Sequence, residues 1–126
     1  MTATTTTALV WVGVALVGGI GSVLRFLVDR AVARRVARPF PFGTLAVNIS
    51  GAALLGLLAG LALSKNAALL AGTAFVGAYT TFSTWMLETQ RLGEERETWP
   101  AFANIVVSVV LGMAAAFLGQ WVAEQI

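Results

Sequence analysis

The sequence predicts an all-α membrane protein with four transmembrane helices. Of its 126 residues, 58% are hydrophobic and only 11% are charged, and the mean hydropathy is +0.84. Soluble domains carry about 25% charged residues, so this composition indicates a protein of the bilayer. A spanning helix needs about 20 mostly apolar residues. Four such windows lie near residues 8–28, 43–63, 67–88 and 101–123.

Short polar segments separate the four windows. The first loop, DRAVARRVARPFP, carries Pro39 and Pro41, which end one helix and lead into the next. The second loop is a few residues around Lys65, and the third is QRLGEERETWP, whose Trp99 and Pro100 are typical of an interface anchor and a helix start. Because no repeat or linker is visible, we expect residues 1–126 to form a single four-span transmembrane domain in the cell (inner or plasma) membrane.

Small or polar residues follow helical spacing within the spans. In the first span, Arg25 and Asp29 are four residues apart, so we expect them to pair. The second and fourth spans carry similar stripes, which are either packing seams or cavity linings. Their members are Thr44, Asn48, Gly51 and Leu55 in the second span, and Asn104, Ser108, Gly112, Ala115 and Gly119 in the fourth.

The third window contains GAYTTFSTWMLE, residues 77–88, where hydroxyls and a carboxyl interrupt an apolar run. Polar groups at membrane depth need partners, so this stretch indicates a pore lining or a polar seam. Gly77, Thr80 and Thr81 weaken a helix at mid-span. A helix broken here would free carbonyls for a cation or a cavity. The alternative is a continuous helix whose threonine hydroxyls bond back to the preceding turn.

The residue inventory argues against several other functions. The chain has no His and no Cys, which removes the common proton shuttle, thiol nucleophile and soft metal ligands, so we expect no enzyme. A small four-span drug/proton antiporter needs an acid inside its first span, where this chain has Arg25. A non-transporting adaptor or holin-like oligomer would explain Gly56 and Gly60 as a helix-contact pair, but not the mid-span threonines.

Three segments resemble the motif blocks of the Fluc (CrcB) fluoride channels: GGIGSVLRF at 18–26, PFGTLAVNISG at 41–51 and FVGAYTTFSTWMLE at 75–88. The resemblance covers nearly the whole chain. It implies a fluoride-specific channel that exports fluoride passively from the cytoplasm and reduces its toxicity. It also implies an antiparallel, dual-topology dimer with two anion pores and a structural sodium ion at its centre, which is not transported.

The resemblance also implies roles for individual residues. Backbone carbonyls of Gly77 and Thr80 would hold the sodium ion, and Phe82 would be the first of two rings that contact fluoride. The second ring position holds Trp85, where the family usually has Phe. Because that change restores the usual residue, we expect Trp85→Phe to be tolerated. The remaining pore or vestibule positions are Asn48, Ser108, Thr81, Ser83, Arg25 and Glu88.

The predicted chemistry suits a small, strongly hydrated anion. Amide and hydroxyl donors replace water around fluoride, and the positive edges of aromatic rings can contact it. Trp85 offers both an indole edge and an N–H donor. For Glu88, an ion pair near a helix end remains the alternative to a pore role.

Positive charge is unevenly distributed between the two ends of the predicted bundle. Only Lys65 lies on the side of the termini and second loop, whereas six arginines lie in the first and third loops: Arg30, Arg34, Arg35, Arg38, Arg91 and Arg96. The positive-inside rule therefore predicts that both termini lie outside. Because an antiparallel homodimer must insert both ways, a heterodimer with an oppositely oriented paralogue is also open.

Overall fold

The computed structural model describes residues 1–126 and is entirely helical. Three long helices are continuous, whereas the chain between the second and third of them is divided into shorter pieces. The long helices are α1 (Ala3–Arg35), α2 (Phe42–Gly60) and α6 (Thr98–Gln125). The shorter pieces are α3 (Lys65–Ala68), the π-helical segment η1 (Leu69–Val76), α4 (Gly77–Tyr79) and α5 (Ser83–Glu94).

Three of the predicted windows lie on helices that are long and apolar enough to cross a membrane, namely α1, α2 and α6. The chain is thus an all-α, multi-pass membrane protein. The window at 67–88 differs because helical hydrogen bonding stops at Tyr79 and resumes at Ser83. No single helix there reaches spanning length. The π-helical turns of η1 were not predicted from the sequence.

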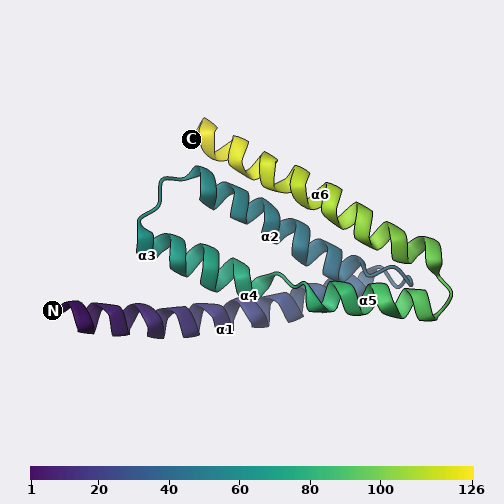
Figure 1. Ribbon diagram of the computed structural model, residues 1–126, viewed down its shortest axis with the longest axis horizontal. Coiled ribbons are helices and arrows are strands. Elements are labelled where there is room, and N and C mark those ends of the chain that lie inside the picture. The colour runs from purple at the N-terminus through teal and green to yellow at the C-terminus, as the bar shows by residue number, and fades with distance from the viewer.

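The helices lie side by side along one long axis (Figure 1). Both termini and the α2–α3 connection lie at one end, and the α1–α2 and α5–α6 connections lie at the other. α2 packs most extensively on α6, whereas α1 packs on η1, α2 and α4. The segment between α4 and α5 passes across α1. This crossing brings Thr80 within reach of Arg25 on α1 and Thr81 within reach of Asn48 on α2.

The seam between α2 and α6 is built on glycines. A Cβ on Gly56 would meet the backbone of Ala116, and a Cβ on Gly60 would lie 2.6 Å from the Ala123 methyl group. From the other side, a Cβ on Gly119 would meet the carbonyl of Ala53. Glycine therefore lets these two backbones touch. Gly56 and Gly60 are helix-contact residues, as the adaptor alternative also assumed, and they do not discriminate between the functions.

Candidate functional site

The interruption at Thr80–Phe82 begins where Thr80 becomes extended, with ψ 162°. The Thr80 hydroxyl and its N–H both donate to the carbonyl of Val76, each at 2.9 Å. The methyl group of Thr80 lies so close to Gly51 of α2 that a Cβ at Gly51 would collide with it. The glycine in the PFGTLAVNISG motif is therefore what lets the interrupted segment approach α2.

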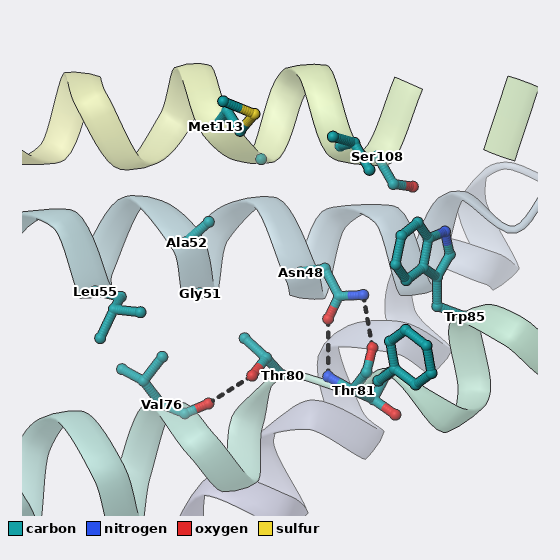
Figure 2. Close-up of a pocket in the computed structure, with 13 residues that line it drawn as sticks. Asn48, Gly51, Ala52, Leu55, Val76, Thr80, Thr81, Trp85, Ser108 and Met113 are labelled. Carbon is teal, nitrogen blue, oxygen red and sulfur yellow. Dashed lines mark hydrogen bonds between the residues drawn. The ribbon is translucent and has the colours of Figure 1, made fainter. Parts of the chain in front are cut away.

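Asn48 on α2 holds the interrupted segment through two hydrogen bonds. Its Oδ1 accepts from the N–H of Thr81 at 2.8 Å, and its Nδ2 donates to the carbonyl of Thr81 at 2.8 Å (Figure 2). The side-chain amide thus pairs with both backbone polar groups of one residue, Thr81, as a residue of a neighbouring strand would. An unpaired peptide group costs several kcal/mol in lipid, so this pairing is what makes the interruption tolerable.

The backbone carbonyls of Gly77 and Thr80 are among those that lose their usual helical partners at the interruption. The N–H of Thr81, which would serve Gly77 in a continuous helix, donates to Asn48 instead. The N–H of Thr84, which would serve Thr80, donates to the Thr81 hydroxyl at 3.3 Å. That hydroxyl also donates to Thr84 Oγ1 at 3.1 Å, so Thr81 caps the start of α5. The carbonyls of Gly77 and Thr80 are left for other groups.

Arg25 donates a hydrogen bond to the Thr80 carbonyl, which corrects the expectation that Arg25 pairs with Asp29. Its Nη1 donates to the carbonyl of Thr80 at 3.4 Å, and no Arg25–Asp29 ion pair forms. The expected i, i+4 spacing is present on α1, but the freed carbonyl competes for the guanidinium. Asp29 lies instead against Gly43, where any Cβ would collide with its carboxylate.

A groove of about 400 Å³ opens between α2, the interrupted segment and α6 (Figure 2). It brings together residues that are far apart in the sequence, on three elements. Its polar and aromatic lining consists of Asn48, Thr80, Thr81, Phe82, Trp85 and Ser108. Small and apolar side chains complete the walls, including Gly51, Ala52, Leu55, Val76, Gly112 and Met113. All but one of these polar and aromatic residues were predicted as pore positions; Thr80 was predicted as a sodium ligand.

The two aromatic residues stand edge to face in this groove. The ring centroids of Phe82 and Trp85 are 5.7 Å apart, and their planes meet at 83°. Phe82 is 70% exposed, so its ring is available to the groove and beyond. The indole N–H of Trp85 is not free, because it donates to the backbone carbonyl of Asn104 at 3.0 Å. The expectation that this N–H serves as a donor to an anion is therefore not met in the structure.

Two buried polar atoms on α6 have no hydrogen-bond partner: Oδ1 of Asn104 and Oγ of Ser108. Asn104 is completely buried, and its Nδ2 donates to the Thr89 hydroxyl at 2.9 Å and to the Trp85 carbonyl at 3.4 Å. The sequence placed Asn104 on the polar stripe of α6 but assigned it no site role. Its i, i+4 spacing from Ser108 was the signal that could have included it.

Other predicted residues lie outside this groove. A second groove, of about 420 Å³, is lined by both Gly77 and Thr80 and shares Thr80 with the first. Glu88 lines a polar cavity of about 130 Å³ near the α1–α2 loop and forms an ion pair with Arg91, which also donates to the Pro39 carbonyl at 3.3 Å. Ser83 is exposed and lines none of these cavities.

Residues 12–120 match the family described as CrcB-like protein, Camphor Resistance (CrcB). The chain belongs to this family. It is 77% identical to "Fluoride-specific ion channel FluC 2" of Mycobacterium tuberculosis, over 98% of this chain and 99% of the relative. A protein of the same name from Mycolicibacterium paratuberculosis is 79% identical over 94% and 98%. "Fluoride-specific ion channel FluC 1" of Streptomyces avermitilis is 44% identical over 83% and 88%.

Proposed function

We propose that this chain forms a fluoride-specific ion channel that lets fluoride leave the cytoplasm passively. The observation that carries the proposal is the groove in which Asn48, Ser108 and an edge-to-face aromatic pair converge from three elements. The names of relatives at 77% and 44% identity support the same function.

The groove offers chemistry suited to a small anion. Ser108 has a hydroxyl with no partner, and Asn48 Nδ2 has a second N–H beyond the one given to Thr81. The edges of aromatic rings carry positive potential, and Phe82 is exposed enough to present one. Neutral donors and ring edges can replace the water around fluoride without binding it as tightly as a fixed charge would.

The proposed channel is a dimer of antiparallel chains, each spanning the membrane four times with a broken third helix. The groove is an open trough on one chain, lined by Phe82, Val109 and Met113, which are all exposed. A second copy or an oppositely oriented paralogue would close it into a pore. The arginine bias favours termini outside, so we expect reporter fusions at Ile126 to lie mainly outside. Equal populations on both sides would contradict that bias.

The proposed channel also holds a structural sodium ion through the carbonyls of Gly77 and Thr80. These residues fit, because the helical N–H partners of both carbonyls donate elsewhere and both residues line the second groove. Arg25 gives the Thr80 carbonyl only a long bond, which leaves a lone pair available. Bound sodium would supply fixed positive charge to hold these carbonyls in place. Replacing sodium with a bulky organic cation should lower dimer stability; unchanged stability would exclude the site.

The decisive experiment is ion efflux from liposomes that contain this purified chain alone. We expect rapid fluoride efflux and no chloride efflux. Phe82→Ile should cut fluoride efflux without unfolding the protein, since Phe82 is mostly exposed in the single chain. Leu87→Ile is a matched control, because Leu87 is equally exposed on α5 but lines no groove. Absence of fluoride efflux from the folded chain would contradict a homodimeric channel, and co-reconstitution with a paralogue would then test the heterodimer.

A further inference from the structure

We infer that Trp85 keeps the hydroxyl of Ser108 free for an anion by occupying the backbone carbonyl of Asn104. Trp85 is thereby a positioning residue, which acts on Ser108 through its hydrogen bond to the Asn104 carbonyl. The identification of the anion as fluoride rests on the proposed function. The hydrogen bonding between Trp85 and Asn104 does not depend on it.

Hydroxyls inside helices normally bond back to a carbonyl three or four residues earlier. Several hydroxyls of this chain do so, since Thr80 donates to Val76 at 2.9 Å, Thr89 to Trp85 at 2.9 Å and Ser50 to Val47 at 3.1 Å. Ser108 is different, because its Oγ is buried and has no partner. The carbonyl four residues before it belongs to Asn104.

That carbonyl already accepts its full complement of hydrogen bonds. A carbonyl oxygen has two lone pairs. Within α6, the helical pattern assigns one of them to the N–H of Ser108. The indole N–H of Trp85 takes the other at 3.0 Å. The Ser108 hydroxyl is therefore excluded from the bond to the carbonyl four residues earlier.

The contact between Trp85 and Asn104 is fixed from both sides. The Asn104 side chain returns a bond to the Trp85 carbonyl at 3.4 Å and a second to Thr89 at 2.9 Å. Asn104 is fully buried, so these bonds are shielded from solvent. In Figure 2 the nitrogen of the Trp85 indole faces α6, close to Ser108 at the end of the groove. Ser108 thus lines the same groove as Phe82 and Trp85.

A phenylalanine at position 85 would lack the N–H and would release the Asn104 carbonyl. The Ser108 hydroxyl would then bond back to Asn104 and cease to be a free donor. This changes the expectation that Trp85→Phe is tolerated. Because a hydrogen bond to a charged group is worth roughly a tenfold to hundredfold change in an equilibrium or rate, we expect Trp85→Phe and Ser108→Ala each to reduce fluoride efflux by about tenfold or more.

The combination of the two changes is the sharp test. If Trp85 acts through Ser108, Trp85→Phe should have no further effect in a Ser108→Ala background. Multiplied effects in the double variant would mean that the indole acts directly and would overturn the inference, as would full efflux from Trp85→Phe alone. Replacing the indole with its benzothiophene isostere, which keeps the ring shape but lacks the N–H, should match Trp85→Phe. Trp121→Phe, at an exposed tryptophan on α6, is the control and should be neutral.

A measurement that does not depend on efflux separates this inference from the proposed function. The ¹³C signal of the Asn104 backbone carbonyl can be followed by NMR in the folded protein, because the chain has only three Asn residues to assign. With Trp85 present, Ser108→Ala should leave the carbonyl signal in place, because the Ser108 hydroxyl makes no bond to this carbonyl. In the Trp85→Phe background, Ser108→Ala should move the signal upfield, because the substitution removes the hydrogen bond that Ser108 then makes. A shift in the first case, or none in the second, would overturn the inference even if the chain conducts no fluoride.

Discussion

Two contacts of α2 hold this protein together in opposite ways. Toward α6, α2 presents glycines, and the two backbones meet with almost no polar side chain between them. Toward the interrupted segment, one asparagine pairs with both the backbone N–H and the backbone carbonyl of Thr81. The first contact depends on the absence of side-chain volume, and the second depends on one side chain of the right length. Grooves form beside the second contact because an interrupted backbone cannot pack as closely as a helix.

The largest expected effect comes from filling the α2–α6 contact. In Gly119→Ala, the new methyl group would meet the Ala53 carbonyl and the Leu57 nitrogen, which are backbone atoms that cannot turn aside. Overpacking costs about 1–3 kcal/mol, and we expect a loss of folding stability at or above the upper end. Thermal unfolding in detergent measures it. Gly19→Ala is the control, because no atom lies within 4 Å of the added carbon; equal stability of the two variants would show that the seam is not tight.

A net loss of stability similar to that of Gly119→Ala, together with a complete loss of efflux, is expected for Asn48→Leu. The substitution leaves the N–H and carbonyl of Thr81 without partners, at about 1–3 kcal/mol for each buried group, partly recovered if the segment becomes helical. Unfolding and fluoride efflux should be measured on the same preparation. Asn66→Leu, at an exposed position in α3, should change neither quantity. Normal efflux from Asn48→Leu would show that the pairing with Thr81 is dispensable.

The smallest effect is expected at the polar end of the bundle. Glu88 pairs with Arg91, but the two side chains are 27% and 46% exposed. Such pairs contribute about 0–1 kcal/mol, so Glu88→Gln should lower stability by less than about 1 kcal/mol, and less still at high salt. Glu124→Gln, which removes a carboxylate outside any ion pair, is the control. A loss comparable with that of Gly119→Ala would place Glu88 in the structural core rather than at its edge.

The long apolar helices were predictable because length and composition alone determine them. The windows at 8–28, 43–63 and 101–123 fall within or nearly within α1, α2 and α6. The ends of windows and helices differ. For example, α1 begins before its window because the Thr2 side chain caps it by accepting a hydrogen bond from the N–H of Thr5. The sequence also indicated the weak point near Gly77, Thr80 and Thr81, because glycine and threonine compete with helical hydrogen bonding.

Partner choice within the site could not be predicted from spacing. Arg25 and Asp29 have the right separation to pair, but the Thr80 carbonyl, 55 residues away, takes the guanidinium. Likewise, the indole N–H of Trp85 goes to Asn104, 19 residues away. Both outcomes depend on which backbone carbonyls a segment distant in the sequence brings within reach of these side chains.

The pairing of Asn48 with Thr81 also has a consequence for how the chain enters the bilayer. The backbone N–H and carbonyl of Thr81 are paired only when α2 already lies beside them. Only four residues, 61–64, connect α2 to α3. Residues 42–94 are therefore best inserted together as a helical hairpin, because a third segment that entered alone would carry the unpaired backbone groups of Thr81 into lipid. Biogenesis would then couple the second and third segments, and lengthening the 61–64 connection should slow membrane insertion more than lengthening the α5–α6 loop.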